Sequence, residues 1–171
     1  MQFRGPDALD LSLNVNGRNV TAHVAPGHSL LDTLRESLGL TGAKKVCNEG
    51  DCGACTVIID GRPVYSCLTL AIACEGRAVE TIEGLATEGE LHPVQQAFID
   101  HDAYQCGFCT PGQVMSIVAL LRADPSARED DVKRAVSGNL CRCGAYANIV
   151  AAGVAASRKT SAPHGPARAR R

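Results

Sequence analysis

The chain has 171 residues, a length that allows one ordinary domain or two small ones. Apolar residues make up 45% of the sequence, enough to form a core, and the net charge of −1 argues against a nucleic-acid partner, which would need a basic face. No apolar stretch is long enough to span a bilayer. The first residues, MQFRGPD, lack an apolar signal core and a twin-arginine pair, so we expect a cytoplasmic protein; export alongside a signal-bearing partner is the open alternative.

The first half of the chain predicts a mixed sheet with one helix. Alternating apolar and polar residues lead into an Asn16-Gly17 turn, which is typical of a β-hairpin. Ser29 is a suitable N-cap for the helix that follows, and Gly39 ends it. The expected elements are a hairpin over 9–25, a helix over 29–39, a loop over 42–55, and strands over 56–59, 64–70 and 78–82, with a turn at Asp60-Gly61 after the first of these strands. This order predicts a β-grasp domain over residues 9–84.

After a short polar linker the apolar period changes from 2 to 3.6, which predicts helices. Thr110 is a suitable cap and Pro111 a suitable first residue for the most regular of them. A capping box from Ser126 to Glu129 begins the next. The expected helices cover 93–102, 111–123, 127–137 and 146–157. Short helices joined by brief loops predict a four-helix bundle over residues 85–157.

The predicted fold class is therefore α+β, with an N-terminal β-grasp domain followed by a C-terminal four-helix bundle. Residues 158–171 carry basic side chains and prolines with almost no apolar content. Because such a segment cannot bury enough apolar surface to offset the entropy of ordering it, we expect a disordered tail.

The nine cysteines point to metal or redox chemistry, because a cytoplasmic setting keeps thiols reduced. Four of them, Cys47, Cys52, Cys55 and Cys67, have the spacing C-x4-C-x2-C-x11-C, which follows the plant-type ferredoxin pattern. Glycines in the same loop permit the tight turns that wrap three thiolates around a [2Fe–2S] cluster. We therefore expect a plant-type ferredoxin domain over residues 9–84. A structural zinc site, which usually takes two C-x2-C pairs, fits this spacing poorly.

The second cysteine group combines C-x2-C at Cys106 and Cys109 with C-x-C at Cys141 and Cys143. We expect these thiols at helix starts, where partial positive charge lowers a thiol pKa and suits a negatively charged cluster. Spacing by itself leaves a zinc site or a redox dithiol open. The ninth cysteine, Cys74, is expected to be a small buried apolar residue rather than a spare ligand.

Three stretches resemble the signatures of the iron–sulfur subunit of the xanthine oxidase family. They are CNEGDCGAC at 47–55, QCGFCTPG at 105–112 and GNLCRCG at 138–144. The resemblance extends over residues 10–155. It implies one [2Fe–2S] cluster on Cys47, Cys52, Cys55 and Cys67 and a second on Cys106, Cys109, Cys141 and Cys143. It also implies that Gln105 and Cys143 contact a pterin cofactor.

The resemblance implies an electron-transfer role within a molybdenum hydroxylase, an oxidoreductase that acts on aldehydes or N-heterocycles. Electrons would leave a molybdenum–pterin site on a large partner subunit and pass through the second cysteine group and then the first. They would end on FAD or on a cytochrome of another subunit. The chain itself is then expected to carry no catalytic residue.

Two other functions stay open at this stage. One is a free-standing carrier that moves electrons through two clusters without a fixed partner. The other is an interaction module stabilised by zinc. Copurification with a large molybdenum subunit would favour the first interpretation over the carrier, and the brown colour of an iron–sulfur protein would exclude the zinc module.

Overall fold

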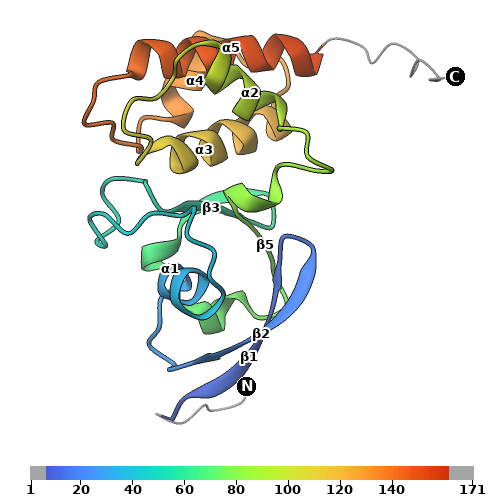
Figure 1. Cartoon of the computed structure of the whole chain (residues 1–171), viewed down its shortest axis with the longest axis vertical. Helices are drawn as coiled ribbons and strands as arrows, with labels where there is room; N and C mark the ends of the chain where they lie inside the picture. The colour runs from blue at the N-terminus through green and yellow to red at the C-terminus, as the bar shows by residue number, and fades with distance from the viewer. Residues whose placement is uncertain (1–6, 162–171) are drawn as a thin grey trace, which may run out of the picture.

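The computed structural model describes residues 7–161, which form two stacked regions (Figure 1). The sheet region, residues 9–84, contains a five-stranded sheet and the short helix α1. The helical region, residues 85–161, contains α2, α3, α4 and α5. The α+β class predicted from the sequence is therefore confirmed. Within the described residues no helix has the length and apolar character needed to cross a membrane.

The sheet is mixed in direction. Its strands are β1 (Leu9–Val15), β2 (Arg18–Val24), β3 (Thr56–Ile59), β4 (Arg62–Tyr65) and β5 (Ala78–Glu80), in the order β2-β1-β5-β3-β4. β1 runs antiparallel to β2 and parallel to β5, and β3 runs antiparallel to both β4 and β5. The predicted turns at Asn16-Gly17 and Asp60-Gly61 are confirmed, with φ angles from 49° to 80°. Asn, Asp and Gly are the residues that tolerate this left-handed backbone best.

Helix α1 (Leu30–Asp32) continues as a wider π-helical turn, η1 (Thr33–Ser37). Ser29 caps it as predicted, because its hydroxyl oxygen accepts the Asp32 N–H at 3.0 Å. The apolar face is buried in the core of the sheet region through Leu30, Leu31 and Leu34. The predicted helix is therefore in the expected place, but it ends at Ser37.

The predicted strand over 64–70 is wrong beyond Tyr65. The chain leaves β4 there and turns into the 3-10 helix η2 (Ser66–Leu68), so Cys67 lies on a turn and not on a strand. The Ser66 hydroxyl donates to the Cys55 carbonyl oxygen at 2.7 Å, a side-chain bond that competes with strand pairing. Two further 3-10 helices follow, η3 (Ala71–Cys74) and η4 (Ile82–Gly84).

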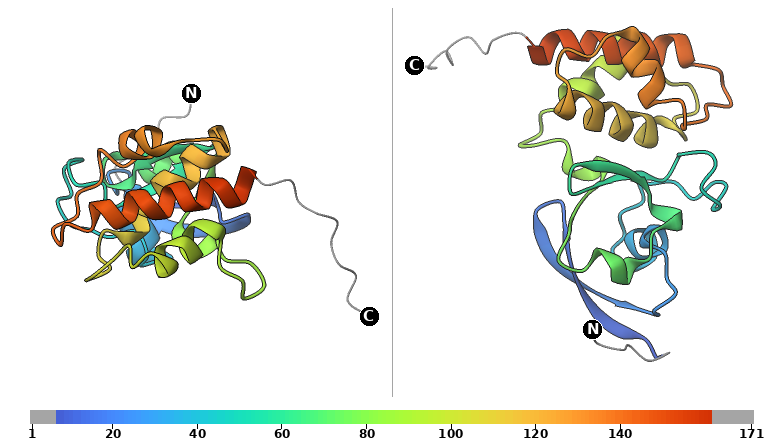
Figure 2. Two further views of the ribbon diagram at one scale, coloured as in Figure 1. Left: turned by 90° about the horizontal axis from the view of Figure 1, so that it is seen from above. Right: turned by 180° about the vertical axis from the view of Figure 1, so that it is seen from behind.

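The helical region contains α2 (Pro93–Asp100), α3 (Thr110–Ala123), α4 (Glu129–Ala135) and α5 (Tyr146–Ser161). Seen from above, α5 lies across the top of this region (Figure 2). It extends to Ser161, so residues 158–161 continue the helix instead of starting the predicted tail. Residues 162–171, the rest of that predicted tail, lie outside the described residues.

Two predicted helix caps differ from the structure. Thr110 is the first residue of α3 and the residue before it occupies the capping position. Ser126 does not form a capping box, because its hydroxyl donates to the Asp124 carboxylate at 2.7 Å. The Arg128 backbone N–H instead donates to Asp131 at 2.9 Å, and α4 begins one residue later.

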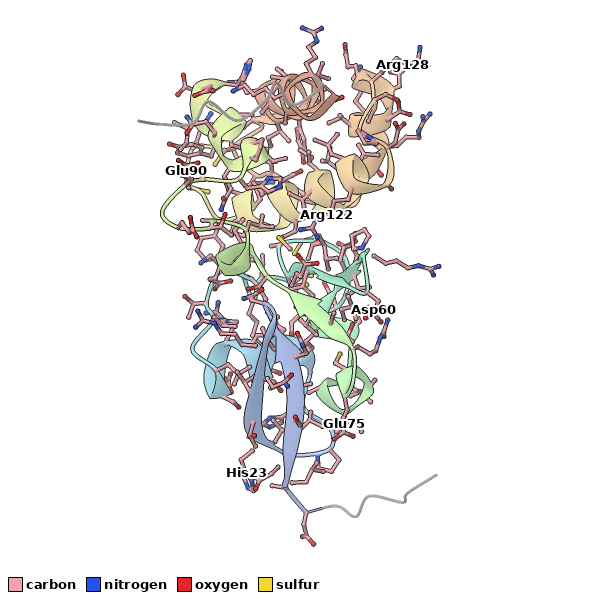
Figure 3. The ribbon with its side chains drawn as sticks, turned by 90° about the vertical axis from the view of Figure 1, so that its right-hand side faces the viewer. His23, Asp60, Glu75, Glu90, Arg122 and Arg128 are labelled. Carbon is pink, nitrogen blue, oxygen red and sulfur yellow. The ribbon has the colours of Figure 1, made fainter. Side chains whose placement is uncertain are left out.

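Strand β3 connects the two regions because its successive side chains point to opposite faces. Val57 and Ile59 pack in the core of the sheet region, whereas Ile58 packs in the core of the helical region. Helix α3 lies against this strand. Arg122 of α3 also pairs with Glu80 at 2.8 Å, and Figure 3 shows Arg122 where α3 meets the sheet region.

Candidate functional site

Three cysteines of the first group, Cys47, Cys52 and Cys55, lie in the loop that leads into β3, and the fourth, Cys67, lies on η2. The loop is on the side where the sheet region meets the helical region (Figure 1). The loop turns at Asn48, Gly50 and Gly53, whose φ angles are 60°, 81° and 68°. The loop passes close to η2 at Gly50, where a Cβ atom would lie 2.2 Å from Leu68 Cδ1, and the positive φ of Gly50 favours glycine there. This close approach brings Cys67 to the other three cysteines.

The four thiols of this group interact as two pairs, Cys47 with Cys52 and Cys55 with Cys67. The backbone N–H groups of Asp51 and Cys52 both donate to Cys47 Sγ, each at 3.4 Å. Amides aimed at sulfur stabilise negative charge there. The loop therefore provides both the thiols and the hydrogen-bond donors that a negatively charged cluster requires.

The surroundings give the thiols of the first group different acidities. Backbone N–H groups, that of Glu49 most strongly, lower the pKa of Cys47 to about 6. Burial, together with the adjacent Cys55 thiol, raises the pKa of Cys67 to about 11. Because a thiolate is the form that binds metal, iron binding would release the proton that Cys67 retains at neutral pH.

The second cysteine group comes from two separate loops of the helical region. Cys109 is the capping residue of α3, and Cys106 lies in the loop before it. Cys141 and Cys143 lie in the loop before α5. Glycines with φ angles of 79° and 75° follow Cys106 and Cys143. Only Cys109 therefore stands at a helix start, whereas the sequence placed all four there.

These thiols also interact as two pairs, Cys106 with Cys143 and Cys109 with Cys141. Cys106 is exposed, and its pKa is lowered mainly by the Phe108 N–H and to a smaller extent by the Cys143 thiol. Burial, and to a smaller extent the Cys141 thiol, raises the pKa of Cys109 to about 12. The group therefore extends from the protein surface into the core, which would leave one side of a bound cluster open to a partner.

Each group provides a donor set that fits a [2Fe–2S] cluster. Such a cluster takes two protein ligands on each of its irons, and each group presents its four thiols as two pairs. Among residues 7–161, no three His, Cys, Asp or Glu side chains converge in the way that a single metal ion would require. Thr110, next to Cys109, has a buried hydroxyl without a partner in this part of the chain and can donate to a bound group.

Two remaining residues from the sequence analysis have clear positions. Gln105 is exposed and directly precedes Cys106 in the second group. Cys74 is 0% exposed in the core of the sheet region, so its interpretation as a small buried residue is confirmed. It lies on η3, and burial raises the pKa of its thiol.

Asn139, which lies between the two cysteine groups, was not expected from the sequence to have a role. This side chain is 3% exposed, and its Nδ2 donates to the Gly53 carbonyl oxygen at 2.9 Å. Gly53 belongs to the first cysteine loop, and Asn139 stands two residues before Cys141 of the second group. That proximity to Cys141 was the available signal, but it does not reveal that the contact crosses to the other region.

Two family models match the chain. A "2Fe-2S iron-sulfur cluster binding domain" matches residues 13–85, and a "[2Fe-2S] binding domain" matches residues 81–153. The xanthine dehydrogenase iron-sulfur-binding subunit of Escherichia coli O157:H7 is 43% identical over 147 residues, which cover 84% of this chain and 91% of that protein. The chain belongs to the iron–sulfur subunits of the xanthine oxidase family. The two family models together give this subunit two [2Fe–2S]-binding domains in one chain.

Other relatives of this iron–sulfur subunit agree. The aldehyde oxidoreductase iron-sulfur-binding subunit PaoA of Escherichia coli (strain K12) is 47% identical over 162 residues, covering 86% of this chain and 71% of that protein. The crystal structure of quinoline 2-oxidoreductase from Pseudomonas putida 86 matches with a TM-score of 0.86 and 42% identity, covering 90% of this chain and 96% of that chain. The sheet region is therefore a ferredoxin-like domain, and the subunit transfers electrons within an oxidoreductase complex.

Proposed function

We propose that Cys47, Cys52, Cys55 and Cys67 bind one [2Fe–2S] cluster and that Cys106, Cys109, Cys141 and Cys143 bind a second. The observation that carries the proposal is that the fold brings the four thiols of each group together, with the backbone N–H groups of Asp51 and Cys52 directed at Cys47 Sγ in the first group. When bound, each cluster would accept and release one electron at a time. The residues around it hold the thiols in place and direct backbone N–H groups toward sulfur.

We propose a direction for the electrons. The helical region would face a large subunit that holds a molybdenum–pterin cofactor, and the sheet region would face an FAD-binding or cytochrome subunit. Gln105 and Cys143 would contact the pterin. The exposure of Gln105 beside the exposed thiol of Cys106 supports this role, because a partner's cofactor can reach only an accessible side chain.

The surface beside the second cysteine group supports a partner on that side. Four large apolar side chains there are 41% to 55% exposed and line a hollow of about 380 Å³ next to Cys106 and Cys109. They are Val46, Phe108, Leu140 and Tyr146. Exposed apolar side chains grouped in this way are typical of interaction surfaces. We infer that the molybdenum-bearing subunit covers them.

We propose the domain boundaries that the sequence suggests, with the second extended to the end of α5. The ferredoxin domain would cover residues 9–84 with a β-grasp fold, and a four-helix bundle would cover residues 85–161. The packing of α2 against α5 and of α4 against α5 supports a bundle.

A cytoplasmic location stays a prediction, and fractionation of cells that express the tagged chain tests it.

Metal analysis and copurification test the proposal. The purified native subunit should be brown and should contain about four iron atoms per chain, two for each cluster. A colourless protein with zinc would contradict it. The native protein should also elute with a large molybdenum-bearing subunit, whereas a stable monomer that carries electrons alone would favour a free-standing carrier.

A surface variant locates the partner. Phe108→Ser should weaken copurification with the molybdenum-bearing subunit and leave the iron content unchanged. Ile99 of α2 is 48% exposed and does not line the hollow, so Ile99→Ser is the matched control. Equal retention of the partner by both variants would contradict the proposed surface.

A further inference from the structure

The two cysteine groups are joined by a direct backbone contact. The Leu140 N–H donates to the carbonyl oxygen of Cys52 at 2.9 Å. Cys52 belongs to the first group, and Leu140 is bonded covalently to Cys141 of the second. A connection from one proposed ligand to the other therefore runs through the backbone, with this hydrogen bond as its one non-covalent step.

Asn139 holds this contact from the residue next to Leu140. Its Nδ2 donates across the region boundary to the Gly53 carbonyl oxygen at 2.9 Å and to Thr56 Oγ1 at 3.2 Å. Its Oδ1 accepts from Ser116 of α3 at 2.8 Å. The side chain is thus fixed on both sides of the boundary, because it bonds the first cysteine loop and helix α3 together.

The backbone of Asn139 is fixed as well. Its carbonyl oxygen accepts the Nε2 of Gln113, a side chain that is 0% exposed, at 2.9 Å. The loops meet so closely here that a Cβ atom on Gly53 would lie 2.4 Å from the Gly138 carbonyl oxygen. A Cβ on Gly112 would lie 2.3 Å from the Gly53 carbonyl oxygen. A small displacement of Asn139 would therefore move Leu140 relative to Cys52.

We propose that Asn139 is a positioning residue for electron transfer between the two clusters, and that it acts by holding the Leu140–Cys52 hydrogen bond. This inference rests on the proposed function, which places clusters on both cysteine groups. Covalent bonds and short hydrogen bonds couple redox centres more strongly than gaps of the same length. One electron would pass from the reduced cluster of the second group to the oxidised cluster of the first, without bond cleavage or proton transfer in the chain.

The test compares Asn139→Ala with the native subunit in the complete complex. Asn139→Ala removes both hydrogen bonds that Nδ2 donates, one to Gly53 of the first cysteine loop and one to Thr56 of β3. Two readouts matter beyond activity: the magnetic interaction between the two reduced clusters in EPR, and the rate at which an electron equilibrates between them after rapid reduction by dithionite. We expect a weaker magnetic interaction and a severalfold slower rate, because a wider gap between Leu140 and Cys52 replaces the hydrogen-bonded step. Each cluster should keep its own reduction potential.

Tyr65→Phe is the matched control. The Tyr65 hydroxyl donates across the same boundary to the Gly138 carbonyl oxygen at 2.9 Å, but it lies outside the proposed connection. We expect this variant to keep the native magnetic interaction and the native rate. Equal losses in the two variants would mean that Asn139 only helps to hold the regions together, and this would overturn the proposal.

A second pair of variants tests the hydrogen bond if Asn139→Ala loses iron. Leu140→Pro removes the donating N–H, whereas Leu140→Ala keeps it. Both variants lose the Leu140 side chain, which is 53% exposed and lines the proposed partner surface, so any weaker partner binding is common to the pair. A slower rate in Leu140→Pro than in Leu140→Ala supports the proposal; equal rates in the pair contradict it. Absence of one of the two cluster signals in the native subunit would instead reject the proposed function, so the two failures are distinguishable.

Discussion

In the sheet region three of the four cysteines lie within the nine residues of one loop. In the helical region Cys106 and Cys109 are separated from Cys141 and Cys143 by 31 residues of sequence. The first group is therefore shaped mainly by local turns at Asn48, Gly50 and Gly53. The second depends on the packing of the helices that carry it, because α3 and the loop before α5 must meet. This contrast means that local strain should affect the first group, whereas changes in the helical core should affect the second.

The largest expected effect is the loss of one cluster when a proposed ligand is replaced. Cys55→Ser should remove the cluster of the first group and leave that of the second, while Cys109→Ser should do the reverse. Each variant should retain about half of the native iron. Iron analysis together with EPR of the reduced protein would measure this, and loss of both signals in either variant would contradict two independent sites.

Cys74→Ser is the control for these ligand variants. Cys74 is buried in the same core as Cys55, but its thiol donates to the Leu70 carbonyl oxygen at 3.6 Å and is not among the proposed ligands, so both clusters should remain. We expect only a loss of stability of about 1–3 kcal/mol, because a hydroxyl replaces a thiol in an apolar core. Loss of iron would make Cys74 a ligand and would require a new assignment.

A substitution at Gly53 should damage the first group by strain and collision together. Gly53 and Gly61 have similar positive φ angles, 68° and 80°, but only Gly53 has neighbours where a Cβ would lie. Gly61→Ala should lower the free energy of unfolding by about 1 kcal/mol, from backbone strain alone. Gly53→Ala should lower it by about 1–3 kcal/mol more, because the added methyl group overpacks the junction. Urea unfolding of the two variants measures the difference, and equal costs would contradict the close approach at this junction.

Much of the sheet region was predictable because its signals are local. The Asn16-Gly17 and Asp60-Gly61 turns and the Ser29 cap each depend on residues near in sequence, and all three are confirmed. The strand predicted over 64–70 was wrong because the Ser66 hydroxyl bonds the distant Cys55 carbonyl. The alternating pattern around Ser66 does not indicate a hydrogen bond to the Cys55 carbonyl.

The candidate site was only partly predictable for the same reason. The spacing of the first cysteine group indicated a cluster, and this loop is one continuous segment. The spacing of the second left zinc open until the family resemblance was considered. Asn139 was missed because its role depends on Gly53 and Ser116, which lie 86 and 23 residues away in the sequence.

Two buried serines provide a smaller test of the contrast between the regions. Ser66 bonds the Cys55 carbonyl oxygen at 2.7 Å, and Ser157 bonds the Ala127 carbonyl oxygen at 2.8 Å inside the helical region. Replacing either serine by alanine should lower the free energy of unfolding by about 1–2 kcal/mol. Only Ser66→Ala should also make the first cluster easier to remove with a chelator. Equal rates of iron loss in the two variants would contradict the view that local contacts shape the first cysteine group.

The smallest expected effect is a pH dependence in the helical region. His92 Nδ1 accepts the Val94 N–H at 3.2 Å and so caps α2, and burial lowers the pKa of this histidine. Because the folded pKa lies below the unfolded value of about 6.5, this stabilisation is complete above that pH and is lost as the pH falls through the folded pKa.

His92→Asn keeps an acceptor at the capping position without a group that titrates there. Its unfolding free energy should vary less between neutral and mildly acidic pH than that of the native protein, by about 1 kcal/mol or less. Thermal unfolding at several pH values measures this. An unchanged pH dependence would mean that His92 titrates alike in the folded and unfolded chain.

The most direct test of two clusters in two regions is quantitative EPR of the fully reduced native subunit. We expect two distinct signals, each integrating to about one spin per chain, as two different [2Fe–2S] environments require. A single signal, or total spin near one per chain, would contradict the assignment of a cluster to each cysteine group.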